Sequence, residues 1–126
     1  MNVEARIKTF SLLGNSLKRF LNHEEATSEK ENNFFTVLNE KIDNAIHYNG
    51  WFTKENILFS LNQWSLALEE KKLENWISNY SIDEEKNLTV AIIMAGNIPL
   101  VGFHDFLCVL LSGNKVLIKQ SSNDNQ

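Results

Sequence analysis

The sequence is poor in the residues that hold small disulfide-rich or metal-dependent proteins together. Its 126 residues include one cysteine, one proline and five glycines. A single cysteine, Cys108, excludes an internal disulfide. His23, His47 and His104 are too far apart along the chain for the ligand spacing of a zinc site. We therefore expect a hydrophobic core to stabilise the fold, and we expect no metal site.

Long apolar runs and clusters of basic residues are also absent. The most apolar stretch, Leu100 to Leu111, is interrupted by His104 and Asp105 and is shorter than the ~20 residues of a membrane-spanning helix. The formal net charge is -4, without the clustered Lys and Arg that bind nucleic-acid phosphates. The N-terminus lacks the basic and apolar segments of a signal peptide. These features predict a soluble cytoplasmic protein with no membrane span and no nucleic-acid partner.

The first region, residues 1–80, has apolar residues at helical spacing and polar residues between them. Polar residues 22–33 are predicted to separate the first two helices, and Asn49-Gly50 to form a turn after the second. Thr53 is the expected N-cap of the third helix. The four predicted stripes are Val3, Ile7, Phe10, Leu17 and Phe20; Phe35, Leu38, Ile42 and Ile46; Ile57, Leu61, Trp64 and Leu68; and Leu73, Trp76, Ile77 and Tyr80. We interpret them as core packing rather than a ligand cleft.

The composition changes after a turn-like stretch at 81–87, and residues 88–126 form the second expected region. Residues 88–94 are almost all apolar and rich in β-branched side chains, which predicts a strand covered on both faces. Pro99 is expected near the first position of a helix that runs to about Ser112, and Gly113 should end that helix with a left-handed conformation. Residues 115–119 predict a second, parallel strand. The fold class is therefore α/β, a helical region followed by one βαβ unit.

Two parallel strands leave both edges of their sheet open, and such sheets are usually completed by further strands. Either the chain is part of a longer protein, or the partner strands come from another molecule. We favour the first alternative.

Polar side chains follow the predicted strands. Asn97 comes after the first strand, whereas Lys119, Ser121 and Ser122 lie at and after the end of the second. Ligands of open α/β sheets bind beyond the carboxyl ends of the strands, so we expect the carboxamide of Asn97 and the ammonium of Lys119 to face one cavity. No Gly-x-Gly-x-x-Gly or Walker lysine motif accompanies them. The residues alone indicate a phosphate or oxyanion site.

The stretch from Met94 to Lys119 resembles the aldehyde-dehydrogenase superfamily, in which an Asn-x-Pro turn, an apolar helix, a Gly-Asn step and an apolar strand ending in Lys begin the Rossmann-type coenzyme domain. The segment 95–106 resembles the corresponding segment of the LuxC-type acyl-CoA reductases; it reads Ala-Gly-Asn-Ile-Pro-Leu-Val-Gly-Phe-His-Asp-Phe. Trp51-Phe52-Thr53 with Glu55-Asn56 is similar to the N-terminal segment of the same family. The resemblance covers most of the chain.

This resemblance implies a role for several positions. Asn97 matches the asparagine whose side chain holds the oxyanion of the reaction intermediate. Lys119 matches the lysine that contacts the adenosine ribose of the coenzyme, and Ser121 and Ser122 are neighbouring candidates for coenzyme binding. Many NAD-dependent relatives have a Glu where this chain has Ser122. Its absence relieves repulsion of a 2′-phosphate, so the implied coenzyme is NADPH.

The implied activity is reduction of a long-chain acyl thioester to an aldehyde through a cysteine acyl-enzyme. Cys108 is expected to be a buried, unreactive thiol, and His104 and Asp105 to have structural roles. The nucleophile would lie in a later domain, so residues 1–126 alone should be inactive. Expected partners are the acyl-CoA or acyl-enzyme, the rest of the reductase chain and a second copy of the protein. The alternative is a non-catalytic interaction or nucleotide-binding module.

Overall fold

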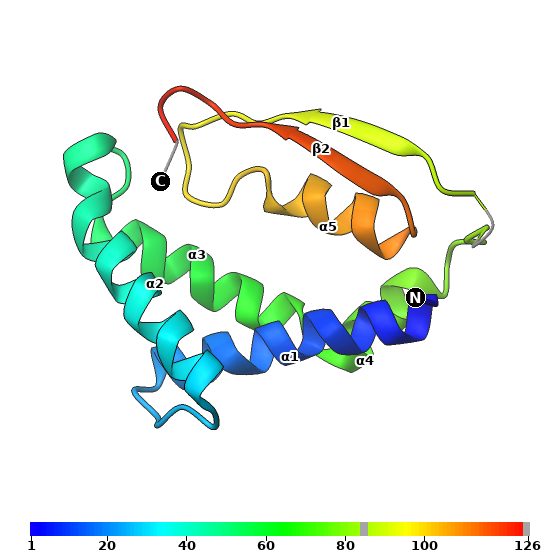
Figure 1. The fold of residues 1–126 in the computed structure, drawn as a ribbon, viewed down its shortest axis with the longest axis horizontal. Helices are drawn as coiled ribbons and strands as arrows, with labels where there is room; N and C mark the ends of the chain where they lie inside the picture. Colours follow the sequence, from blue (N-terminus) through cyan, green and yellow to red (C-terminus); the bar gives the residue numbers. More distant parts are fainter. Residues whose placement is uncertain (84–85, 125–126) are drawn as a thin grey trace.

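The computed structural model describes residues 1–83 and 86–124. Its elements are α1 (Val3–Leu21), α2 (Glu29–Tyr48), α3 (Lys54–Ala67), α4 (Glu70–Ile77), β1 (Thr89–Ile93), α5 (Phe103–Leu111) and β2 (Lys115–Lys119). The middle of the expected turn at 81–87 and the last two residues of the second expected region lie outside the described residues. Helix α5 lies between the sheet and the layer that contains α1, α3 and α4 (Figure 1).

The starts of the first three helices follow from side-chain caps. Asn2, Ser28 and Thr53 each accept a hydrogen bond from the backbone N–H three residues further on, which satisfies one of the free donors of a helix N-terminus. The prediction for Thr53 is confirmed. The polar break between the first two helices is shorter than expected, because the cap at Ser28 begins α2 at Glu29, before the first apolar residue of that helix.

Two groups of buried side chains form the core. One joins α1, α2 and α3 and consists of Leu17, Phe20, Ile42, Ala45, Phe52, Ile57 and Leu61. The other joins α1 and α4 to α5 and consists of Ile7, Phe10, Leu68, Leu73, Leu107 and Leu111. The second group crosses the compositional change near residue 87, so both regions of the sequence share it. The expected stripe of α2 is wrong at Ile46, which is 41% exposed while its neighbour Ala45 is buried.

The predicted βαβ unit is confirmed at the level of its elements. Strands β1 and β2 are parallel, with Thr89 opposite Lys115 and Ile93 opposite Lys119. Gly113 ends α5 with a φ of 83°, as expected for a left-handed C-terminal residue. Arg6 of α1 donates from Nε to the carbonyl oxygen of Leu111 at 3.1 Å, and this bond ties the last turn of α5 to the helical layer.

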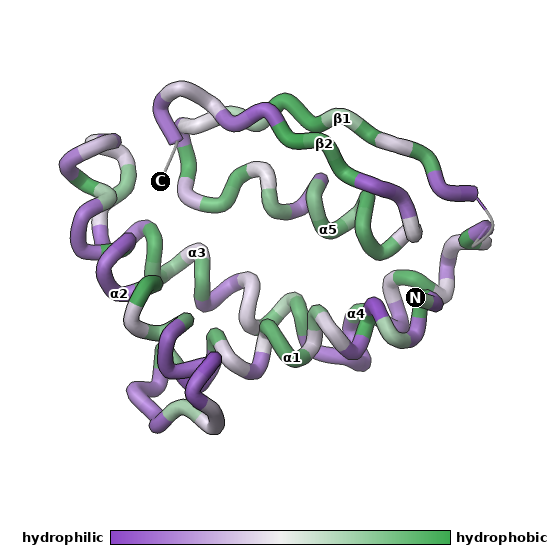
Figure 2. The backbone as a smooth tube through the Cα atoms, viewed as in Figure 1, coloured by the Kyte–Doolittle hydropathy of each residue, from purple (hydrophilic) through white to green (hydrophobic). Residues whose placement is uncertain are grey.

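The expectation that the first strand is covered on both faces is wrong within the described part of the chain. Ile92 faces α5 and is buried, whereas Ile93 is 81% exposed and Leu117 of β2 is 63% exposed. In Figure 2 the apolar strands have α5 on one side only. The β-branched side chains favour the strand conformation, but they do not determine whether a second layer covers it. The helical layer packs against the far side of α5, which leaves the outer face of the sheet open.

Pro99 is not at the first helical position, because α5 begins at Phe103. Pro99 is buried in the preceding turn, and Leu100 after it has a φ of 59°. A left-handed residue cannot continue a right-handed helix, so Leu100 separates Pro99 from α5. The backbone N–H of Phe103 then donates to the carbonyl oxygen of Leu100 at 3.0 Å.

A carboxylate fastens α1 to α2. Glu31 is buried and accepts hydrogen bonds from Arg19 and Ser16 of α1 through one oxygen. Its other oxygen accepts from the backbone N–H and the hydroxyl of Thr27, each at 2.7 Å. These hydrogen bonds, of which the one from the Arg19 guanidinium contributes most, hold the pKa of Glu31 well below its ordinary value of 4.5.

We expect Glu31→Gln to lower the thermal midpoint by several degrees at pH 7, because the neutral amide loses the charge-assisted bonds to Arg19. A carboxylate with a lowered pKa stabilises the fold fully above its unfolded pKa, and this contribution is lost as the pH falls toward the folded pKa. The difference between the two proteins should therefore shrink between pH 5 and pH 3. Calorimetry across this range measures it, with exposed Glu29→Gln as the control. Equal midpoints for wild type and Glu31→Gln at pH 7 would contradict the assignment.

Candidate functional site

The candidate site is the carboxyl edge of the two strands. Ile93 and Lys119 are register partners at this edge, and the N–H of Met94 donates to the carbonyl oxygen of Lys119 at 3.0 Å. The chain leaves both strands here, in the connection 94–102 and in the segment 120–124 (Figure 1). Parallel strands place these two segments beside each other, which is where ligands of open α/β sheets bind.

Asn49 holds the two segments together. Its buried carboxamide donates to the carbonyl oxygen of Gly96 at 2.7 Å and to that of Asn123 at 2.9 Å. Its oxygen accepts from the backbone N–H of Trp51 at 3.0 Å. The sequence indicated only a turn at Asn49-Gly50 and missed this role, because the two carbonyl groups lie 47 and 74 positions further along the chain.

The close approach of the two segments requires a glycine. A Cβ atom at position 96 would lie 2.6 Å from the Oγ of Ser121 and 3.3 Å from the Cβ of Asp124. The Ser121 hydroxyl accepts from the backbone N–H of Asn123 at 3.2 Å. Burial raises the pKa of Asp124 above its ordinary value. The space beside the Cα atom of Gly96 is therefore occupied by Ser121 and Asp124, and no ligand can enter it.

The four residues singled out from the sequence are all at this edge. Asn97, Lys119 and Ser122 are exposed, and Ser121 is half-buried against Gly96. The side chains of Asn97 and Lys119 make no hydrogen bond or ion pair with residues 1–83 or 86–124, so their donors are available. None of the five principal cavities of the described residues is lined by any of the four. The four residues therefore lie together at an edge of the sheet, and a cavity shared by Asn97 and Lys119 stays a prediction.

Cys108 lies elsewhere, on α5. Its Sγ is 3.8 Å from the Nδ1 of His104. Burial, and secondly the charge of Asp105, raises the pKa of the Cys108 thiol. Since a nucleophilic cysteine needs a lowered pKa, this thiol is not activated by its histidine neighbour.

His104 is exposed, and its ring lies beside two tryptophans. Its ring centroid is 6.5 Å from that of Trp64 and 5.8 Å from that of Trp76, and its Nδ1 is 3.6 Å from a carboxylate oxygen of Asp105. These contacts support a packing role for the imidazole. Among residues 1–83 and 86–124 no three His, Cys, Asp or Glu side chains are grouped as a metal site would require. Within the same residues no helix combines the length and apolarity of a membrane-crossing segment.

No family model, curated protein or solved structure matches this chain. The geometry of the carboxyl edge and the residues found there are therefore what indicates a function.

Proposed function

We propose that this chain is the N-terminal part of an NADPH-dependent acyl-CoA reductase of the LuxC type. The proposal is supported by one observation above all. The parallel pairing of β1 and β2 brings the connection that carries Asn97 and the strand end at Lys119 to the same edge of the sheet. The two segments are fastened there by a buried side chain from the helical region. An oxyanion donor and a coenzyme-binding cation on neighbouring segments are what this reaction needs.

Asn97 would act on the acyl group. Its side-chain N–H is exposed and makes no bond within the described residues, so it can donate to an oxygen that becomes negative when the thioester carbonyl is attacked. In comparable sites one such donor is worth about 3 kcal/mol, because it is aimed at charge that develops in the transition state. The turn that carries Asn97 is held at Gly96 by the carboxamide of Asn49. The helical region would thus position the donor.

The coenzyme would be held by Lys119 with Ser121 and Ser122. An exposed ammonium and two hydroxyls fit the ribose hydroxyls and a 2′-phosphate, because they offer donors and no carboxylate. Lys119 and Ser122 are exposed at and after the end of β2, so solvent and ligands can reach them. NADPH supplies the hydride when it is bound. Lys119 would then orient the coenzyme by binding its ribose, and Ser122 would leave room for the phosphate.

The nucleophile is proposed to lie outside these 126 residues. Cys108 is the only cysteine, and its raised pKa keeps it protonated at neutral pH. In the proposed reaction a cysteine thiolate attacks the thioester carbonyl, the CoA thiolate leaves, and hydride transfer to the acyl-enzyme releases the aldehyde and regenerates the thiolate. The proposed partners are therefore an acyl-CoA and the domain that carries this cysteine.

The coenzyme part of the proposal can be tested with two lysines of one strand. Lys115 and Lys119 are both exposed and stand at opposite ends of β2. We expect Lys119→Ala to weaken NADPH binding about tenfold, since it removes a charged hydrogen bond worth ~1.5 kcal/mol, and Lys115→Ala to leave binding unchanged. Tryptophan fluorescence is a suitable readout because Trp51 follows Asn49 at this edge. An equal effect of the two substitutions, or no saturable binding by the wild type, would refute this role.

A second candidate function is a non-catalytic interaction module. It is favoured by the open face of the sheet, where Ile93 and Leu117 are exposed. Oxidation of NADPH in the presence of a long-chain acyl-CoA distinguishes the two functions, when it is assayed with the product of a reading frame that extends into a cysteine-bearing domain. Light scattering of the 126-residue chain tests whether a second copy is the partner. A defined complex without any reductase activity would favour the module.

A further inference from the structure

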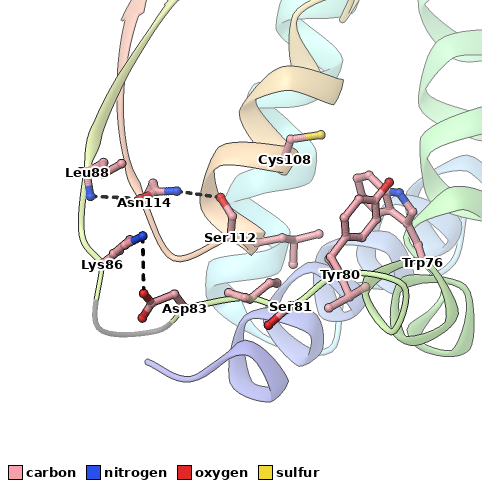
Figure 3. A pocket seen from close by; sticks show the side chains of 12 residues that line it. Trp76, Tyr80, Ser81, Asp83, Lys86, Leu88, Cys108, Ser112 and Asn114 are labelled. Atoms are coloured by element: carbon pink, nitrogen blue, oxygen red, sulfur yellow. Dashed lines mark hydrogen bonds and ion pairs between the residues drawn. The ribbon is translucent and has the colours of Figure 1, made fainter.

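The largest of the principal cavities lies at the amino edge of the sheet, away from Asn97 and Lys119. It has a volume of about 490 Å³ and is bounded by α4, the following connection and the second half of α5 (Figure 3). Small-molecule pockets typically span about 300–1,000 Å³, so the space suffices for a ligand. The described residues that line it are Trp76, Ile77, Tyr80, Ser81, Ile82, Asp83, Lys86, Leu88, Cys108, Leu111, Ser112 and Asn114.

The side chains that line this amino-edge cavity are mainly apolar, and two of them, Trp76 and Tyr80, are aromatic. Trp76 and Tyr80 lie close together on one side of the cavity, and Ser112 and Asn114 lie on the other (Figure 3). Leu111 is fully buried beneath it. Tyr80 is 62% exposed, so part of its ring remains accessible to another aromatic group. Aromatic pairs gain about 0.5–1.5 kcal/mol beyond the burial of their surface.

Four of the polar side chains around the cavity already have partners. The ammonium of Lys86 pairs with the carboxylate of Asp83 at 3.8 Å. Asn114 donates to the hydroxyl of Ser112 at 2.9 Å and accepts from the backbone N–H of Leu88 at 3.0 Å. A charged group placed against the apolar side chains of the cavity would lose its hydration there, which is costly. The lining therefore selects against charge.

Cys108 contributes a neutral side chain to the lining of the amino-edge cavity. Its thiol is partly buried, and this burial keeps it protonated at neutral pH. Of the lining residues that the structure describes, Asp83 and Lys86 carry a formal charge, and they pair with each other.

We propose that the amino-edge cavity binds a small uncharged aromatic molecule, with the rings of Trp76 and Tyr80 as its main contacts. The site is separate from the carboxyl edge and does not depend on the proposed reductase function. A naphthalene-sized molecule would stack against the aromatic side and cover the thiol of Cys108, where it would replace water next to apolar side chains.

Alkylation of Cys108 tests this proposal, because it is the only cysteine of the chain. We expect 2-naphthol to slow the reaction of the full chain with iodoacetamide at least several-fold and in a saturable way. The carboxylate of 2-naphthoic acid, with the same ring system, should give little protection. Two exposed tyrosines provide matched variants: Tyr80→Ala should weaken the protection, whereas Tyr48→Ala, at a site outside the cavity, should leave it intact.

Three results would overturn the proposal. They are no protection by 2-naphthol, equal protection by the naphthoate, and equal protection in the wild type and in a folded Tyr80→Ala variant. If the thiol instead becomes protected as the protein concentration rises, without any added ligand, a second copy of the chain covers the cavity and the small-molecule site is refuted. Circular dichroism establishes that each variant is folded.

Discussion

Replacing Asn49 by alanine is expected to lower the free energy of unfolding by about 3 kcal/mol. In the wild type, the buried carboxamide of Asn49 donates hydrogen bonds to the carbonyl oxygens of Gly96 and Asn123, and the substitution removes both donors. It also leaves the backbone N–H of Trp51 without its acceptor, so three part-buried hydrogen bonds worth about 1 kcal/mol each are lost together. The connection 94–102 and the segment 120–124 should also separate from α2 and from each other. Urea denaturation followed by circular dichroism measures the change in stability.

Asn44 is the matched control for this substitution. It is an exposed asparagine of α2, the helix that Asn49 follows, and its amide donates only to the carbonyl oxygen of Glu40 one turn earlier, at 2.9 Å. Asn44→Ala should therefore change stability by no more than about 0.5 kcal/mol. Faster hydrogen exchange at residues 94–102 is expected in Asn49→Ala alone. If both variants unfold at the same urea concentration as the wild type, Asn49 does not hold the carboxyl edge together.

Gly14→Leu is expected to destabilise the fold by about 3 kcal/mol. Helices α1 and α3 cross at this glycine so closely that a Cβ atom there would lie 2.8 Å from the Cβ of Leu68. The backbone oxygens of Ser65 and Leu68 are each 3.4 Å away, so neither a rotamer change nor a small shift makes room. Leucine favours the helix by up to ~1 kcal/mol over glycine, but the overpacking of fully buried Leu68 outweighs this gain.

A second glycine provides the comparison. A Cβ atom at Gly50 meets no atom within 4 Å, and Gly50→Ala should change stability by less than about 0.5 kcal/mol. The stability of Gly14→Ala should lie between those of Gly14→Leu and Gly50→Ala, because this substitution introduces the close contact but adds only one methyl group. The order of the three variants in a urea titration tests the crossing. An unaffected Gly14→Leu protein would show that α1 and α3 are further apart than the structure has them.

Part of the carboxyl edge could be predicted from the sequence, and part of it could not. The positions of Asn97 and Lys119 follow from two strands and the helix between them, each of which has a strong local pattern. That Asn49 fastens this edge could not be predicted, because an asparagine before a glycine is a common turn signal and carries no information about distant carbonyl groups. The amino-edge cavity was missed for the same reason, since Tyr80, Cys108 and Asn114 meet only when α4 and α5 are packed.

By itself the sequence determined which segments are helices and strands. Apolar spacing, the cap at Thr53 and the glycine at position 113 act over a few residues, and their energies do not depend on the rest of the chain. Only the tertiary structure decided which surfaces remain open. Helix α5 packs one face toward the sheet and the other toward α1 and α4, so the helical layer never reaches the outer face of β1 and β2. Burial of that kind depends on how whole layers stack, and no local pattern of residues encodes it.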